Sequence, residues 1–226
     1  MRVNKLLSNY GYCSRKEASR LIEDGRVKVN GSISIPGQWV EEEDLILLDD
    51  VPVEPKERIY LALNKPAGIT CTAEKSAAGN IIDFMDYGDF IFPVGRLDKD
   101  SQGLILMTND GELANRILES DNEYEKEYLV TVDRGFDDSF MEGMSAGVDI
   151  LGVRTKECRV NRVSGDTFSI TLTQGLNRQI RRMSRAFGYT VVRLERIRIL
   201  NVSLEGIEYG KWRKLTEEEI SGLKKA

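Results

Sequence analysis

Four charged side chains crowd into the stretch GRLDKDSQGLILMTNDG, which covers residues 95–111. They are Arg96, Asp98, Lys99 and Asp100. The apolar run 104–107 follows them and the turn residues 109–111 close it, which predicts a buried strand that ends in a turn. A carboxylate held beside such a strand can serve as a general acid, a general base or a nucleophile. Most acids in loops are simply hydrated, so this stretch alone leaves Asp98 open between a catalytic and a solvated role.

The absence of histidine narrows the chemistry that this chain can perform. It excludes Ser-His-Asp and Cys-His catalysis and the usual histidine-ligated metals. Acid–base or nucleophilic steps must therefore use carboxylates, Lys, Tyr, Cys or groups assisted by Arg. The cysteines Cys13, Cys71 and Cys158 are scattered and odd in number, which argues against a disulfide framework or a zinc site and fits a cytoplasmic setting. Cys71 is interpreted as a packed side chain rather than a nucleophile.

The bulk properties are those of an ordinary soluble protein. The 226 residues allow one large or two smaller domains, with 41% hydrophobic and 31% charged residues. Every apolar run is far shorter than the roughly 18 residues of a membrane span. Residues 1–20 lack the long apolar core and the small-residue cleavage site of a secretory signal, so we expect a cytoplasmic protein.

Positive charge is concentrated in two segments, although the net charge is −5. Residues 1–30 hold seven Lys or Arg against three acids, and residues 177–198 hold seven arginines against one glutamate. The acids gather elsewhere, in residues 41–50 and 217–219. Two basic patches on an acidic protein predict local contacts with phosphate groups.

Residues 1–35 predict two short helices followed by a hairpin. Apolar residues at helical spacing stop at Gly11, and a capping box at 14–17 then starts a helix that ends at Gly25. Two β-prone segments flank the turn 30–31, Asn-Gly, which predicts the hairpin. The basic side chains of the second helix lie off its apolar face, where they are either hydrated or bind a partner. They are Arg15, Lys16 and Arg20.

This order of elements resembles the small alpha-L RNA-binding module first described in a small-subunit ribosomal protein. The matching residues are Leu6, Ser14, Arg15, Ala18, Leu21, Ile22, Gly25, Val27, Val29, Asn30 and Gly31. In that family the basic helix and its flanks lie against the RNA backbone. The resemblance therefore implies that Arg15, Lys16 and Arg20 contact phosphates.

The rest of the chain predicts a linker and a larger domain of mixed secondary structure. We expect the module to cover residues 1–50, a linker with two prolines and mixed charge to cover 51–58, and the larger domain to cover 59–226. In the larger domain, strands are expected at 60–63, 126–132, 168–172 and 189–194, a rigid turn at 64–68 and a helix at 178–187. Without a βαβ rhythm, this pattern predicts an α+β fold around a mixed, mainly antiparallel sheet with flanking helices.

Four stretches of the larger domain together resemble the RsuA-type pseudouridine synthases, which also carry the alpha-L module. They are LNKPAG at 63–68, GRLDKDSQGLILMTNDG at 95–111, KEYLV at 126–130 and LTQGLNRQIRRM at 172–183. The resemblance runs from Met1 to about Leu215. The segment 196–212, with LTQGLNRQIRRM, looks most like the RluF-like branch, which acts on large-subunit rRNA.

The resemblance implies a reaction and a partner. The reaction is the site-specific isomerisation of uridine to pseudouridine in ribosomal RNA. It breaks the bond from ribose to the base nitrogen, turns the base and rejoins it through carbon. Because it is redox-neutral and needs no group donor, no cofactor or metal is expected. Small-subunit rRNA or tRNA as substrate remain open, as does a catalytically inactive RNA-binding ribosome-assembly factor on the same scaffold. Because the sequence shows no apolar heptad and no spare interface segment, we expect a monomer, and the scattered cysteines favour the cytoplasm as its setting.

The resemblance also implies roles for individual residues. Asp98 is then the catalytic carboxylate, Tyr128 lies against the flipped target base, and Arg181 pairs with Asp98. Since burial raises the pKa of a lone carboxylate, we expect Arg181 to keep Asp98 ionised. Whether Asp98 attacks the sugar, attacks the base or acts as a general base stays open. The further RNA-binding candidates are Lys65, Arg96, Arg178 and Arg182, while Asp100 is expected to bind loop backbone and Arg96 could instead brace its own loop.

Overall fold

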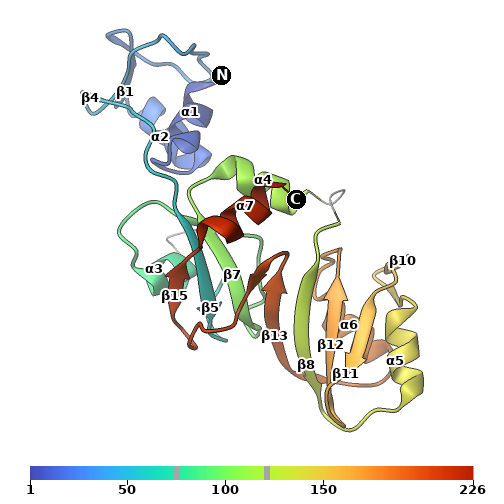
Figure 1. Cartoon of the computed structure of the whole chain (residues 1–226). Helices are drawn as coiled ribbons and strands as arrows, with labels where there is room; N and C mark the ends of the chain where they lie inside the picture. The colour runs from blue at the N-terminus through green and yellow to red at the C-terminus, as the bar shows by residue number, and fades with distance from the viewer. Residues whose placement is uncertain (74–76, 120–122, 226) are drawn as a thin grey trace.

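The computed structural model describes residues 1–73, 77–119 and 123–225, which form a small N-terminal module and a larger domain (Figure 1). The larger domain is built on a nine-stranded sheet. Within the described ranges, none of the helices combines the length and the apolarity needed to span a lipid bilayer.

The N-terminal module packs two helices against a small sheet of strand order β2-β1-β3-β4. Its elements are α1 (Val3–Asn9), α2 (Arg15–Glu23), β1 (Val27–Val29), β2 (Ser32–Ile33), β3 (Ile46–Leu48) and β4 (Val51–Pro52). The predicted cap of the second helix is confirmed, because the Ser14 hydroxyl accepts a hydrogen bond of 3.1 Å from the Glu17 N–H. Val3, Leu7 and Ile22 bury their side chains together with the inward face of β1, as their helical spacing predicted.

The linker begins later than predicted. Strand β4 pairs with β3 in antiparallel register, and the Val53 N–H donates to the Ile46 carbonyl. The first three residues of the predicted linker 51–58 therefore belong to the module. Pro52 is tolerated in this strand because β4 is the edge of its sheet, where a missing N–H costs no ladder hydrogen bond.

The large sheet follows the order β11-β12-β8-β13-β7-β5-β15, with β14 paired to β13 and β6 paired to β7. Its strands are β5 (Tyr60–Lys65), β6 (Phe92–Val94), β7 (Gln102–Thr108), β8 (Lys126–Val132), β11 (Arg159–Arg162), β12 (Thr167–Leu172), β13 (Val191–Ile199), β14 (Val202–Ser203) and β15 (Trp212–Lys214). The helices of the domain are α3 (Ile81–Met85), α4 (Gly111–Leu118), α5 (Asp138–Ser145), α6 (Gln179–Ala186) and α7 (Glu217–Lys225), and a separate hairpin joins β9 (Asp149–Ile150) to β10 (Val153–Arg154). Among the described strands, β7 and β13 pair in parallel and the other pairs are antiparallel, which confirms the α+β prediction.

Several element boundaries differ from the sequence prediction. The strand at 126–132 is found as predicted, whereas the segment expected at 189–194 begins at Val191 and runs on to Ile199. Asn64 and Lys65 continue strand β5 instead of opening a turn. The turn expected at 109–111 is the start of helix α4, because the Asp110 carboxylate accepts hydrogen bonds from the N–H groups of Glu112 and Leu113.

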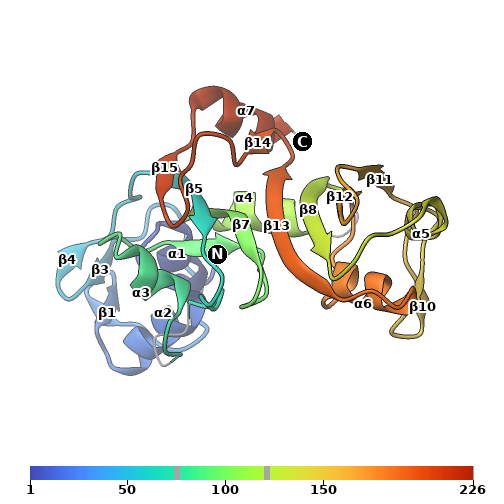
Figure 2. The same cartoon turned by 90° about the horizontal axis from the view of Figure 1, so that it is seen from below.

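Alternation along the strands buries different side chains on the two faces of the sheet. Leu104 and Leu106 pack on one face under α4 and α7, and Ile105 and Met107 pack on the other face under α3. In Figure 2, α7 lies on one side of the sheet and α3 and α6 lie on the other. Tyr128 contacts both the cluster under α3 and a further cluster under α5 and α6, so its ring lies where these two clusters meet.

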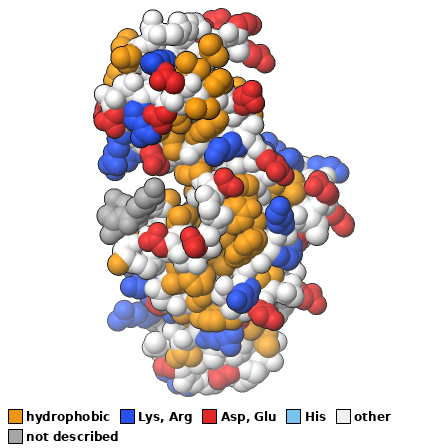
Figure 3. Space-filling model, turned by 90° about the vertical axis from the view of Figure 1, so that its left-hand side faces the viewer, with side chains coloured by type: hydrophobic (Ala, Val, Ile, Leu, Met, Phe, Trp, Pro, Cys, Tyr) orange, Lys and Arg blue, Asp and Glu red, His pale blue; other side chains and the backbone are white. Residues whose placement is uncertain are grey.

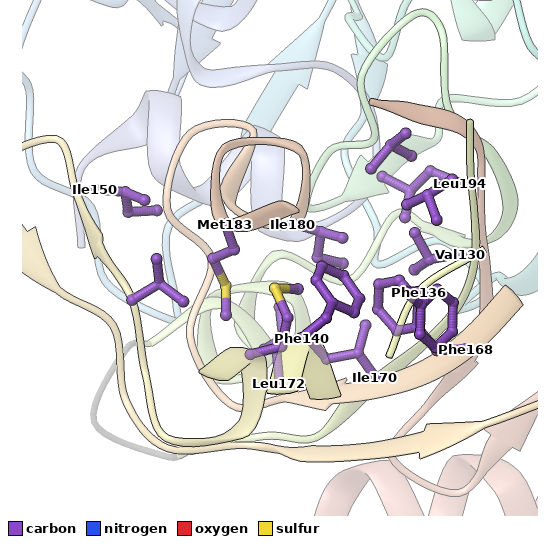
Figure 4. Close-up of a cluster of buried hydrophobic side chains, with 14 residues drawn as sticks. Val130, Phe136, Phe140, Ile150, Phe168, Ile170, Leu172, Ile180, Met183 and Leu194 are labelled. Carbon is purple, nitrogen blue, oxygen red and sulfur yellow. The ribbon is translucent and has the colours of Figure 1, made fainter. Parts of the chain in front are cut away.

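The cluster under α5 and α6 is built around three phenylalanines (Figure 4). Their ring centroids lie 5.0 Å apart for Phe136 and Phe140, 5.6 Å for Phe136 and Phe168, and 5.4 Å for Phe140 and Phe168. The two contacts with Phe168 are edge-to-face, a geometry that adds to the free energy of simple burial. Ile180 and Met183 of α6 are buried in this cluster, which fixes the helix that carries the arginine-rich motif.

Replacing Gly103 by Ala should weaken the junction between β7 and β13. Gly103 has a φ of +101°, and a Cβ placed on it would lie 2.3 Å from the carbonyl oxygen of Arg196. We expect Gly103→Ala to lower the free energy of unfolding by about 3 kcal/mol or more, as measured by urea denaturation. The matched control is Gly206→Ala, where φ is +75° but the space around a Cβ is open. Equal losses in the two variants would contradict a role for the close approach.

Candidate active site

Five residues on adjacent strands form a line across the face of the sheet that carries α3 and α6. Lys65 lies opposite Gly103, Gly103 opposite Arg196, Arg196 opposite Tyr128, and Tyr128 opposite Ile170. Side chains directly opposite one another in paired strands share a face. This line, called the cross-sheet row below, passes from strand β5 through β7, β13 and β8 to β12.

The loop that carries Asp98 is fixed beside the cross-sheet row by backbone hydrogen bonds. The Ser101 N–H donates to the Asp98 carbonyl at 3.0 Å, which closes a turn just before β7. The Gly68 N–H donates to the Lys99 carbonyl at 2.6 Å, and the Lys65 ammonium donates to the Ser101 carbonyl at 2.8 Å. The motifs at 63–68 and 95–111 are thus joined into one structure, and the Asp98 side chain stays about a third exposed, at 31%.

The cation that pairs with Asp98 comes from Arg178, the residue directly before helix α6. The Arg178 Nη1 lies 3.5 Å from the Asp98 Oδ2, and the same guanidinium donates two hydrogen bonds, of 3.1 and 2.9 Å, to the Asp100 carboxylate. Arg178 has left-handed backbone with a φ of 51°, which lets the chain turn into the helix. The hydrogen bond from Arg178 is the main cause that lowers the pKa of Asp100.

Arg181 reaches the same loop from the next turn of α6, but through different atoms. Its Nη1 donates to the Val191 carbonyl at 3.0 Å, and its Nη2 lies 3.2 Å from both the Asp100 carbonyl and the Ser101 hydroxyl. Its ion pair in the described structure is with Asp100, at 3.5 Å. Burial lowers the pKa of Arg181, although an arginine remains charged at neutral pH.

Comparison with known proteins identifies the family. A family model described as RNA pseudouridylate synthase matches residues 59–186, and the S4 domain model matches residues 1–46. Proteins named "Dual-specificity RNA pseudouridine synthase RluF" from Salmonella typhi and Escherichia coli K12 are 52% and 51% identical, over 98% and 99% of this chain and 78% of their own length. "Ribosomal large subunit pseudouridine synthase B" of Bacillus subtilis is 32% identical over 99% of this chain and 95% of its own.

A solved structure has the same fold over its whole length. The protein entitled "Crystal structure of pseudouridylate synthase" superposes with a TM-score of 0.73 at 32% identity and covers 99% of both chains. This chain belongs to the RsuA-type pseudouridine synthases. It is therefore an RNA-modifying isomerase with an RNA-binding S4 domain at its N-terminus.

In the described structure of this pseudouridine synthase, the predicted partners Asp98 and Arg181 attract each other through their charges but form no direct ion pair. Within the described residues, Arg178 makes the ion pair with Asp98, and Arg181 holds the backbone on which Asp98 sits. The reason is geometric, because the Arg181 side chain is anchored at Val191 and meets the loop at Asp100 and Ser101. Asp98 lies toward the start of α6, where Arg178 projects.

Lys65 does not occupy the exposed position expected of an RNA-binding residue, and that prediction is corrected. Its side chain is 0% exposed, and its ammonium donates to the carbonyls of Pro66 and Ser101 at 2.7 and 2.8 Å. Burial is the main cause that lowers its pKa. Lys65 lies in β5 rather than in a turn, so the alternation of the strand turns it inward beneath the Asp98 loop.

The other predicted RNA-binding residues lie at the surface. Those exposed in this way are Arg15, Lys16, Arg20, Arg96, Arg178 and Arg182. Arg182 donates two hydrogen bonds to Asn177 in the loop before α6.

Cys71 is packed in the core, as predicted. It is buried, and burial raises the pKa of its thiol. Its sulfur accepts a hydrogen bond from the Leu97 N–H.

Arg196, to which sequence reasoning assigned no role, lies in the middle of the cross-sheet row. Its side chain is 3% exposed, its Nε donates to the Leu104 carbonyl at 2.7 Å, and its Nη2 is buried without a hydrogen-bond partner in the described structure. The alternation of the strand could have predicted its inward position, because Arg196 lies two residues after the buried Leu194.

Among the described residues, the acids and cysteines form no group of three that could hold a metal ion.

Variants of the two arginines should separate their roles. Arg181 joins β13 to the Asp98 loop through two nitrogens of its planar guanidinium. A lysine cannot reproduce this geometry, so Arg181→Lys should misplace the loop as Arg181→Ala does. Each variant should lower the single-turnover rate on RNA by about 100-fold. Arg178 supplies mainly a charge to Asp98, so Arg178→Lys should retain more activity than Arg178→Ala. Near wild-type turnover in Arg181→Lys would rule out the planar guanidinium as the reason that arginine is needed.

Proposed function

We propose that this enzyme isomerises a uridine in large-subunit ribosomal RNA, with Asp98 as the catalytic carboxylate and the target base flipped against Tyr128. The substrate part is supported by the names of the relatives, one of which specifies the ribosomal large subunit. The names of the Salmonella typhi and Escherichia coli relatives also specify dual specificity, so we propose that a second RNA is modified as well. We further propose that the enzyme acts as a monomer in the cytoplasm.

The observation that supports this mechanism best is the ion pair between Asp98 and Arg178, which joins two family motifs at the start of β7, two strands away from the Tyr128 strand. Asp98 enters from the loop before β7, Arg178 from the start of α6, and Tyr128 from the middle of β8. Arg178 places a positive charge 3.5 Å from the Asp98 carboxylate, where it orients that group toward the substrate. Because pseudouridine contains the same atoms as uridine, the reaction needs no group donor.

Tyr128 is suited to hold the flipped base because it is half-buried between two apolar clusters. The two clusters pack against the Tyr128 side chain and hold it in place. Stacking of a base on an aromatic ring is worth about 1–3 kcal/mol. That free energy offsets the few kcal/mol needed to unstack the target uridine. The exposed cations Arg15, Lys16 and Arg20 contribute phosphate contacts from the module, so binding should weaken steeply with added salt.

The function is tested with Asp98→Asn on unmodified RNA. The wild-type enzyme is incubated with large-subunit rRNA, small-subunit rRNA and tRNA transcripts, which are treated with carbodiimide and mapped by reverse-transcriptase stops. We expect wild-type stops that vanish in Asp98→Asn, because the substitution keeps the shape of the side chain and removes its charge. Absence of stops on all three RNA classes, with RNA binding retained, would favour the inactive assembly factor instead.

The role of Tyr128 is tested by paired substitutions. Tyr128→Phe should keep most of the binding of the flipped base and lose only what the hydroxyl contributes to proton movement. Tyr128→Leu should lose in addition the stacking free energy, which corresponds to about a fivefold to 150-fold loss of kcat/KM. The measurement is the initial rate of pseudouridine formation, and equal losses in both variants would argue against stacking as the main role of the ring.

A further inference from the structure

The indole ring of Trp39 lies at the surface of the N-terminal module with little cover from the protein. Its exposed fraction is 71%, the highest among the exposed large hydrophobic side chains of the described residues. Within residues 1–73, 77–119 and 123–225 its ring takes part in neither an aromatic pair nor a cation–π contact. Figure 3 shows hydrophobic side chains at the surface of the module, which forms the upper end of that view. The core of the module therefore does not explain the position of this ring.

The backbone under Trp39 is fixed. The Val3 N–H donates to the Gln38 carbonyl at 3.0 Å, and the Val40 N–H donates to the Met1 carbonyl at 2.8 Å. These bonds flank an antiparallel bridge between Arg2 and Trp39, and Val40 is 2% exposed in the core of the module. Because both neighbours of Trp39 are held, the ring is displayed on a rigid support, and little conformational entropy would be lost when it binds a partner.

A hollow of about 360 Å³ lies beside this ring and is lined by cations. Its lining residues are Met1, Arg2, Asn4, Lys5, Arg15 and Trp39. Three of the six have cationic side chains, and no acid is among them. An aromatic face beside clustered arginines and lysines is the combination that binds single-stranded nucleic acid, because the ring stacks on a base and the cations meet phosphates. Arg15 is also one of the module residues that we expect to contact RNA.

We propose that Trp39 stacks on an unpaired base of the RNA substrate, while Arg2, Lys5 and Arg15 bind the adjacent phosphates. The inference rests on the proposed function only in requiring that RNA is what this enzyme binds. The module and the cross-sheet row lie in different parts of the molecule (Figure 1), so the stacked base is a different nucleotide from the target uridine. The Trp39 site thus binds an unpaired segment of the RNA at a second position, in addition to the active site.

Charge selects RNA over a second copy of the chain as the occupant of this hollow. A symmetric contact would place the same patch of each copy against the other, and Arg2, Lys5 and Arg15 of the two copies would then face one another. Like charges brought together in this way oppose association. A strand of phosphates carries the complementary charge.

The two tryptophans of the chain allow a direct test by fluorescence. Trp212→Phe leaves Trp39 as the single tryptophan, and Trp39→Phe leaves Trp212, which lies on β15 of the larger domain. Both are made in the Asp98→Asn background, so that the RNA is not converted. Each protein is titrated with an oligouridylate and with a blunt RNA duplex of equal phosphate number, and binding is followed independently by electrophoretic mobility.

We expect the oligouridylate to quench Trp39 strongly, the duplex to quench it much less, and Trp212 to stay unchanged. Trp39→Ala should raise the Kd for the oligouridylate about tenfold, and Trp39→Phe should retain most of the affinity. Unchanged Trp39 emission while the mobility shift reports bound oligouridylate would overturn the proposal. A dimer that sediments as such and dissociates in Trp39→Ala would also overturn it. Quenching by RNA in a protein whose wild-type form yields no pseudouridine would refute the proposed function and leave this inference standing.

Discussion

The short parallel junction between β7 and β13 joins the two halves of the large sheet. One half contains β11, β12, β8 and β13, and the other contains β7, β5 and β15. The junction consists of two residue pairs, Glu195 with Gln102 and Arg196 with Gly103. Side chains reinforce it, since the Gln102 amide donates to the Glu195 carboxylate at 3.0 Å and the Arg196 Nε donates to the Leu104 carbonyl. Asp98 precedes β7 and Tyr128 lies on β8, beyond β13, so the distance between these two groups depends on this junction. Gly103 permits it because a side chain there would collide with the β13 backbone.

A second connection between the two halves runs through charges rather than through backbone pairing. Helix α6 packs in the cluster around Phe140, whereas the Asp98 loop packs against the cluster under α3. Arg178 and Arg181 reach from α6 to Asp100 and to the loop backbone, so they join two separately packed units. Arg181 is largely buried at 13% side-chain exposure and Arg178 is not, at 41%, which makes Arg181 the more rigid of the two contacts.

The two basic segments of the sequence, 1–30 and 177–198, differ in how many of their cations form ion pairs within the protein. Several arginines in 177–198 form ion pairs with acids of the same chain, as Arg193 does with Glu195 and Arg198 does with Glu125 and Glu127. Their charges are then offset locally and attract phosphate less than their number suggests. In the module, the basic residues of α2 and those around Trp39 face solvent. Arg26 and Lys28 of the module are paired with Asp49 and Asp50, so the exposed positive charge of the module comes from α2 and from the residues around Trp39.

The sequence by itself determined the local elements and the family. The cap at Ser14, the alternation of β8 and the four motifs of the larger domain each depend on residues close together in the chain, so they could be recognised without coordinates. Tertiary structure alone decided which side chains share a face and which charge meets which. Lys65 turned inward because β5 continues past the predicted turn, and Arg178 rather than Arg181 met Asp98 because the register of α6 against the loop is set by packing around Phe140 and Ile180. Such contacts join segments about eighty residues apart, and they depend on the free energy of the whole core, which no local pattern of residues records.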